Sequence, residues 1–226
     1  MKKTLTAFAL LIGITSFSQR NNIKVGIPGL FLKHLNLKYE RVMTENTSLN
    51  LTVGNLLARK VEISDDNGDR YSVNTNGIYV IPEYRFYLGS DKDAPRGFYI
   101  APYLRYYKYG MDYTAYEDSV NATVKGSLSS IGVGAQFGAQ WLIADRVSID
   151  LHFFGIGVDN QTFQFDLTTN QNVDLRDYED DFTEDVEEFP IIGSSLQVTS
   201  TADKLTAKAV KPGIGLRGGL SIGFAF

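Results

Sequence analysis

Hydrophobic and polar residues alternate along most of the chain, with large apolar side chains on every second position. In the last segment, GLRGGLSIGFAF, these apolar residues are Leu216, Leu220, Ile222, Phe224 and Phe226. Glycine, serine, alanine and one arginine occupy the other positions. A period of two is that of a β-strand, in which successive side chains point to opposite faces of the sheet. The segment therefore predicts a strand with one apolar face.

The same alternation recurs throughout the chain, for example in IYVIPEYRFYL, FYIAPYLRYYK and SIGVGAQFGAQWLI. We expect strands at 22–30, 34–43, 47–63, 74–89, 97–112, 122–143, 146–168 and 203–226. The connections TENT, GSDKDAPRG and IAD are compact, whereas those near 62–74, 112–122 and 169–202 are longer. An even number of strands, with short turns at one end and long loops at the other, is typical of outer-membrane barrels. The pattern predicts an all-β fold, an eight-stranded antiparallel up-and-down transmembrane β-barrel, although the first hairpin lacks a strong turn signal near residues 30–34.

The N-terminal segment MKKTLTAFALLIGITSFSQ has the pattern of a secretory signal peptide. Two lysines precede an apolar stretch from Leu5 to Ile14, and small residues follow at Ser16 and Ser18. We expect cleavage after Ser18, which leaves residues 19–226 as the barrel. The apolar stretch is shorter than the roughly 20 residues that cross a bilayer. The alternative is a buried N-terminal helix.

Composition excludes several classes of protein. The chain has no Cys, which excludes a disulfide framework and a thiolate zinc site. Without the two lysines of the signal peptide, 20 basic residues remain against 26 acidic ones, a formal charge of −6. This balance does not suit a nucleic-acid-binding surface. The 14 Phe, 13 Tyr and 21 Gly residues favour a sheet over a helical bundle.

Two features of the sequence resemble known outer-membrane proteins. The last strand, with Phe224 and a terminal Phe226, resembles the signal read by the barrel-assembly machinery of Gram-negative bacteria. The layout is similar to the eight-stranded barrel of the outer-membrane protein A type. More narrowly, NNIKVG, LKYERVM, YVIPEYRFYLG, GFYIAPYLRYYKY and PGIGLRGGLSIGFAF resemble small Bacteroidota outer-membrane barrels of unknown function.

The resemblance implies a place in the cell outer membrane, after export by the signal peptide. It implies contact with membrane lipid and lipopolysaccharide and with the assembly machinery during insertion. It leaves open whether other outer-membrane proteins are partners, and it brings no catalytic residues with it.

With the apolar row facing lipid, the opposite row faces the barrel lumen. The charged and titratable residues of that row are Lys38, Glu40, Glu83, Arg85, Arg105, Asp150, His152 and Arg217. Side chains just fill an eight-stranded barrel, and buried charges persist only when they are paired. We therefore predict a lumen plugged by ion pairs, with glycines such as Gly138 and Gly215 leaving room for long Arg and Tyr side chains. The alternative is a narrow gated channel or proton path through the same residues.

Catalytic and metal chemistry has little support in the sequence. Only His34 and His152 offer an imidazole base, and His152 is expected in the lumen, where substrate access is poor. His34 is expected near an outer turn, where some barrels that acylate lipid A use a His with Ser and Asp, but no flanking motif matches. We expect no enzyme, no cofactor and no zinc site.

The segment LRDYEDDFTEDVEEFP, at 175–190, is the least barrel-like. Its apolar residues are Leu175, Tyr178, Phe182, Val186 and Phe189, at intervals of 3, 4, 4 and 3, with Pro190 after them. This stripe predicts a short amphipathic helix in the largest outer loop, packed on the barrel rim or on a partner. The alternative is a solvated loop with an accidental periodicity.

The rest of that predicted helix is acidic. Its candidate surface residues are Asp177, Asp180, Asp181, Glu184, Asp185 and Glu188. Whether this segment binds calcium is left open: carboxylate clusters can bind the ion, but the spacing lacks the glycine turn and alternate-residue ligands of an EF-hand and does not indicate it.

Two classes of function remain at this point. The first is a non-enzymatic structural protein, or an accessory subunit of an envelope complex, that acts through its outer loops. The second is a small pore, or a lipid-modifying enzyme at the barrel rim.

Overall fold

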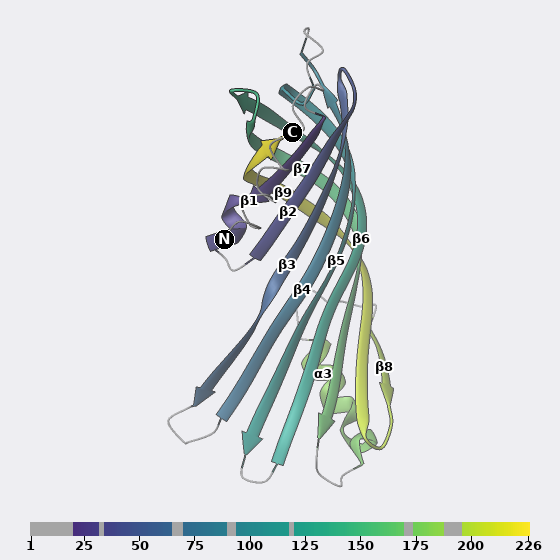
Figure 1. Cartoon of the computed structure of the whole chain (residues 1–226). Coiled ribbons are helices and arrows are strands. Elements are labelled where there is room, and N and C mark those ends of the chain that lie inside the picture. The colour runs from purple at the N-terminus through teal and green to yellow at the C-terminus, as the bar shows by residue number, and fades with distance from the viewer. Residues whose placement is uncertain are drawn as a thin grey trace, which may run out of the picture.

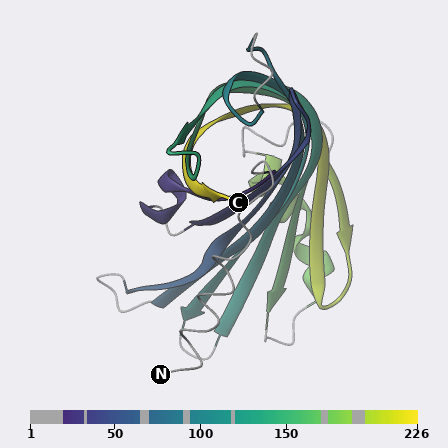
Figure 2. The ribbon, with the colours of Figure 1, turned by 45° about the horizontal axis from the view of Figure 1, so that its top comes forward.

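A computed structural model describes residues 20–31, 34–64, 70–89, 94–117, 120–169, 174–187 and 196–226. The expected signal peptide, at 1–18, and Glu188 lie outside these ranges. The described chain forms one antiparallel sheet that closes into a ring (Figures 1 and 2). No helix within these ranges has the length and apolar character needed to cross a bilayer.

The sheet contains nine strands in the described ranges, one more than the alternation predicts. They are β1 (Asn21–Gly26), β2 (His34–Thr44), β3 (Thr47–Ser64), β4 (Arg70–Tyr87), β5 (Gly97–Glu117), β6 (Val120–Ile143), β7 (Val147–Thr169), β8 (Leu196–Ser200) and β9 (Lys204–Ala225). β1 pairs with β9, so that β1 to β7 and β9 form the ring. β8 pairs only with β9, in the segment expected to be a loop.

The first connection is not a tight turn. β1 ends at Gly26, and a short helix, α2 (Ile27–Phe31), leads toward β2. Pro28 lies in the first turn of this helix, where the missing N–H of proline is tolerated. The same missing N–H would break a strand ladder, which explains why β1 is shorter than the alternation predicts.

Large apolar side chains are exposed around the outer face of the ring. Each ring strand contributes to this apolar belt, for example with Ile23, Leu37, Leu51, Ile78, Phe98, Val133, Ile156 and Ile214. The most exposed part of the belt on β9 lies between Ile214, which is 74% exposed, and Phe224, which is 50% exposed. That length matches the about 9–11 residues that a tilted strand needs to cross a bilayer.

The two ends of the barrel differ (Figures 1 and 2). At one end, short connections join β2 to β3 and β6 to β7, and in the latter Ala144 and Asp145 have φ of 49° and 59°. At the other end, β3 to β7 and β9 continue well beyond β1 and β2. We call these the short-turn end and the long-loop end, and we call the continuation the extension.

A small hydrophobic core lies on the extension. A 3₁₀ turn, η1 (Leu175–Tyr178), and a helix, α3 (Glu179–Glu187), follow β7. Their buried residues pack with residues of β7 and β9; the cluster is Phe163, Leu175, Phe182, Val186, Leu205, Ala207 and Ala209. Ala207 and Ala209 are an even number of residues from Arg217 along β9, so the helix covers the same face of the sheet that lines the lumen.

Candidate functional site

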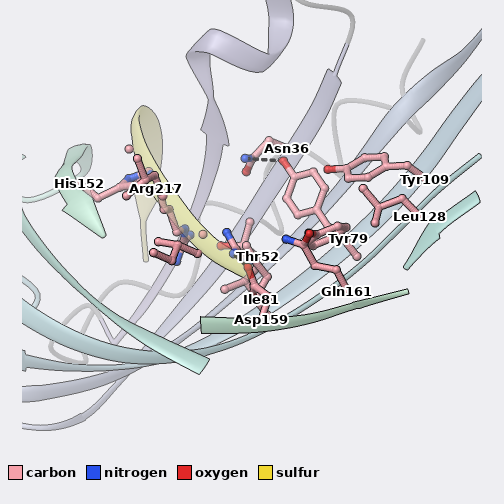
Figure 3. A pocket seen from close by; sticks show the side chains of 16 residues that line it. Asn36, Thr52, Tyr79, Ile81, Tyr109, Leu128, His152, Asp159, Gln161 and Arg217 are labelled. Atoms are coloured by element: carbon pink, nitrogen blue, oxygen red, sulfur yellow. Dashed lines mark hydrogen bonds and ion pairs between the residues drawn. The ribbon is translucent and has the colours of Figure 1, made fainter. Parts of the chain in front are cut away.

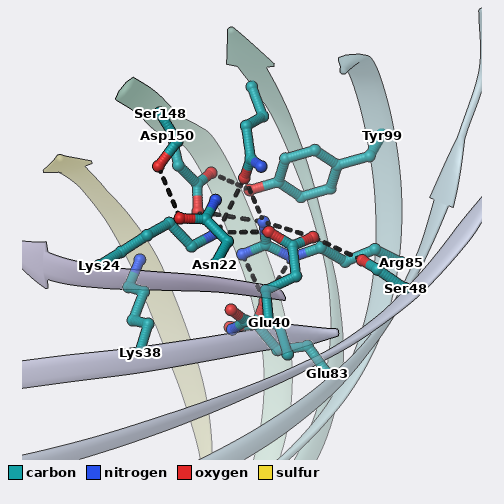
Figure 4. A network of polar contacts seen from close by, with 12 residues as sticks. Asn22, Lys24, Lys38, Glu40, Ser48, Glu83, Arg85, Tyr99, Ser148 and Asp150 are labelled. Carbon is teal, nitrogen blue, oxygen red and sulfur yellow. Dashed lines mark hydrogen bonds and ion pairs between the residues drawn. The ribbon is translucent and has the colours of Figure 1, made fainter. Parts of the chain in front are cut away.

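The polar residues inside the barrel form two layers. One lines a cavity toward the long-loop end (Figure 3), and the other fills the barrel toward the short-turn end (Figure 4). Both layers come from the row of each strand opposite the apolar belt, as the period of two requires. We call the filled layer the plug and the cavity the vestibule.

Lys24 of β1 and Arg85 of β4 lie at the centre of the plug. The Lys24 ammonium donates to Glu40 at 2.7 Å, to Asp150 at 2.8 Å and to the Gln140 carbonyl at 2.8 Å. The Arg85 guanidinium lies 2.9 Å from Glu83, 3.0 Å from Asp150 and 3.6 Å from Glu40. All five charged side chains have no exposed surface. Charges buried this deeply are stable in a fold only with such partners.

Neutral donors complete the hydrogen bonding of the buried carboxylates (Figure 4). Tyr87 donates to Glu40 at 2.6 Å, and Ser48 donates to the same oxygen at 2.5 Å. Tyr99 donates to Asp150 at 2.8 Å. Gln136 donates to Glu83 at 3.0 Å. Hydroxyl and amide donors from several strands thus hold each carboxylate in place.

Positive charge exceeds negative charge in the plug. Arg217 lies 2.6 Å from the second oxygen of Glu83. Lys38 is 2% exposed, and its ammonium lies 3.5 Å from His152 Nδ1. The cations of the plug are Lys24, Lys38, Arg85 and Arg217, and its carboxylates are Glu40, Glu83 and Asp150. One positive charge is therefore left without a carboxylate among the described residues.

The vestibule has a volume of about 460 Å³. Arg105 forms an ion pair with Asp159 across its wall, and the Arg105 guanidinium lies 5.6 Å from the centre of the Tyr107 ring. Asn36 donates to the Tyr79 hydroxyl at 2.8 Å. Figure 3 shows His152 and Arg217 on one side of the cavity and Tyr79 and Tyr109 on the other.

The residues that the alternation assigns to the lumen fall into two groups in the structure, one in the plug and one in the vestibule. Lys38, Glu40, Glu83, Arg85, Asp150, His152 and Arg217 lie in or against the plug. Arg105 does not join them, because it pairs with Asp159 in the vestibule. The expected single network is therefore two separate groups of ion pairs.

Two important residues were missed by the sequence analysis. Lys24 alternates with Ile23 and Val25 in NNIKVG, so the same period of two already places it in the lumen. Asp159 is different. If the alternation of β7 up to Phe153 continued unchanged, Asp159 would lie on the outward face of the strand. A bulge between His152 and Gly155 shifts the register against β9 and reverses the faces. Two adjacent large apolar residues, Phe153 and Phe154, interrupt the alternation in the sequence, and both are exposed in the structure.

The acidic segment folds differently from a single helical stripe. Leu175, Phe182 and Val186 are buried, but Tyr178 is 49% exposed. Tyr178 belongs to the 3₁₀ turn, which has about three residues per turn and does not continue the stripe of an α-helix. Phe189 lies outside the described residues.

The acidic residues of this segment face solvent where they are described. Asp177, Asp180, Asp181 and Glu184 are exposed, Asp185 lies in α3, and Glu188 is outside the described ranges. The Asp174 carboxylate accepts hydrogen bonds from the Arg176 side chain and backbone N–H, which lowers the pKa of Asp174 to about 2. Asp174 thus remains an ionised cap for the turn at neutral pH.

Within the same described ranges, no group of three or more His, Asp or Glu side chains has an arrangement that would hold a metal ion. His34 is the first residue of β2, toward the long-loop end of that strand.

A family model for proteins of unknown function, DUF3575, matches residues 4–178. The chain belongs to the DUF3575 family. Among solved structures, CarO of Acinetobacter baumannii is similar to this DUF3575 chain with a TM-score of 0.39 and 13% identity, covering 93% of this chain and 98% of CarO. CarO2 of the same organism gives a TM-score of 0.35 and 13% identity, covering 92% and 97% of the two chains. A comparison with curated proteins gave no match.

Proposed function

We propose that this DUF3575 protein is an outer-membrane β-barrel of Gram-negative bacteria that is closed to solutes and has no enzymatic activity. It acts as a structural protein, or as an accessory subunit of an envelope complex, through its long-loop end. The observation that carries this proposal is the plug, in which Lys24, Glu40, Glu83, Arg85 and Asp150 are at most 1% exposed. A lumen filled by paired charges supports the barrel and leaves little space for a conducting path.

The apolar belt supports the membrane location. Its side chains are exposed in the isolated chain and would be covered by lipid in an outer membrane. An antiparallel ring built from β1 to β7 and β9 also supports the proposed likeness to the small barrel of the outer-membrane protein A type. In such barrels the short turns face the periplasm, so we expect the extension and α3 outside, next to lipopolysaccharide.

A closed lumen predicts that the purified barrel will not conduct ions. When the protein is reconstituted into planar bilayers, we expect no stable conductance steps under a modest voltage, because the ion pairs of the plug leave no continuous water path. A porin inserted in the same bilayers serves as the positive control. Reproducible channels from the folded protein would support the pore function instead.

Phe226 should affect assembly more than the stability of the finished barrel. Phe226 is 42% exposed, whereas its backbone exchanges two hydrogen bonds with Asn21, at 2.8 and 3.0 Å, where the barrel closes. Replacement by Ala keeps the backbone bonds and removes only the ring, so we expect less protein in the membrane and unchanged heat resistance in a gel-shift assay. The matched control is Phe153→Ala on the belt, which keeps the C-terminus intact. Equal membrane levels for Phe226→Ala and the wild type would contradict an assembly signal at Phe226.

A further inference from the structure

The vestibule is a separate compartment between two packed regions. Its lining includes Tyr79, Arg105, Tyr107, Asp159, Gln161 and Arg217. Arg217 and His152 belong to the plug side, whereas Leu128 both lines the vestibule and packs against the hydrophobic core under α3. The cavity volume of about 460 Å³ falls within the range of roughly 300–1,000 Å³ that is usual for small-molecule sites.

The charge around this compartment is unbalanced. Arg105 and Asp159 neutralise each other in the wall, so the excess positive charge of the plug remains. Arg217 lies at the vestibule side of the plug and is 8% exposed, yet its Nη1 atom has no hydrogen-bond partner in the described part of the chain. A buried guanidinium nitrogen without a partner is unfavourable, and a bound anion would provide the missing acceptor.

The opposite wall is aromatic (Figure 3). Tyr79, Tyr107 and Tyr109 line the cavity, and the rings of Tyr107 and Tyr109 lie 5.3 Å apart. Such rings pack against a flat or apolar body, while a charged group at the other end fixes its orientation. The vestibule thus joins one cationic side to one aromatic side.

We propose that the vestibule binds a small solute with one carboxylate group and a flat apolar body. The Arg217 guanidinium, which lines the cavity and has an Nη1 without an acceptor, binds the carboxylate, and the tyrosines pack against the body. The plug lies directly beyond Arg217, so the solute is held at the long-loop side and does not cross the barrel. This site depends on the lumenal residues alone, and it is independent of any partner of the outer loops.

Three probes of similar shape test the charge requirement. Benzoate, benzamide and benzamidine carry one negative charge, no charge and one positive charge. Saturation-transfer NMR on the folded mature chain in detergent should show saturable binding of benzoate, and about tenfold weaker binding of the other two, because only benzoate makes a charge-assisted bond with Arg217. Empty micelles give the background signal. Equal binding of all three probes, or binding no stronger than to empty micelles, would overturn the proposal.

Variants at Gln161 test the site without removing a charge from the plug. Gln161 lines the vestibule, and Gln161→Glu places a carboxylate there that competes with the ligand. We expect Gln161→Glu to lose benzoate binding by at least about tenfold and the uncharged Gln161→Met to retain it. Arg217→Gln should lose binding as well, whereas Arg146→Gln, at an exposed turn of the other end, should not. Retained benzoate binding in a folded Gln161→Glu protein would refute the site even if Arg217→Gln failed to fold.

Discussion

Replacing Arg85 with Met should lower the free energy of unfolding by about 3–5 kcal/mol, the usual cost of removing one partner from a buried ion pair. Arg85 has no exposed surface and lies within 3.6 Å of three carboxylates, Glu40, Glu83 and Asp150. Met fills a similar volume but offers these groups neither charge nor hydrogen bonds. Urea unfolding in lipid vesicles measures the change through Trp141, the single tryptophan of the chain, which lies on the apolar belt.

Two controls separate the plug from a general effect of removing a cation. Lys208 is exposed on β9, far along the strand from the plug, and Lys208→Met should change stability by no more than about 0.5 kcal/mol. On the Arg85→Met background, Asp150→Asn should cost less than it does in the wild type, with a coupling of about 0.5–3 kcal/mol. Additive effects of Arg85→Met and Asp150→Asn would show that the two residues do not stabilise each other.

The sequence predicts which residues of each strand face the lumen, because the alternation of apolar and polar residues is a property of that strand alone. A strand with lipid on one side and a packed lumen on the other must separate apolar from polar residues at every second position, as Lys38 and Glu40 do on β2. Arg85 and Asp150 are on strands far apart in sequence, but alternation placed each on the lumen side independently. Their shared location then follows from closure of the ring.

The ion-pair partners of the lumen residues could not be predicted from the alternation. Which carboxylate meets Arg105 depends on the stagger of β7 against its neighbours, and the bulge after His152 changes that stagger. The extra strand β8 forms because β1 ends at Gly26 and leaves the outer half of β9 without a neighbour on that side. These features depend on pairing between distant segments, whereas alternation reports only on one segment at a time.

Gly138 illustrates how cross-strand packing sets the shape of the plug. Gly138 on β6 lies opposite Tyr99 on β5, and a Cβ atom at Gly138 would lie 2.3 Å from Tyr99 Cζ. The tyrosine ring lies across the glycine, is 1% exposed and has the Arg85 guanidinium 4.3 Å from its centre. The absence of a side chain at Gly138 therefore allows Tyr99 to reach Asp150.

Replacing Gly138 with Val should lower the free energy of unfolding by about 2–6 kcal/mol, because overpacking typically costs about 1–3 kcal/mol and a buried acceptor without its donor about 1–3 kcal/mol more. The Val side chain displaces the Tyr99 ring, so Asp150 loses the 2.8 Å hydrogen bond from the Tyr99 hydroxyl.

Three control variants separate the contributions. Tyr99→Phe measures the hydrogen bond alone. On a Tyr99→Ala background the obstructing ring is absent, and Gly138→Val should then cost less than about 1 kcal/mol. Gly89→Val, at a site where an added Cβ meets nothing within 4 Å, is the matched control for a glycine replacement. If Gly138→Val costs the same with and without the Tyr99 ring, the glycine does not serve to seat that tyrosine in the plug.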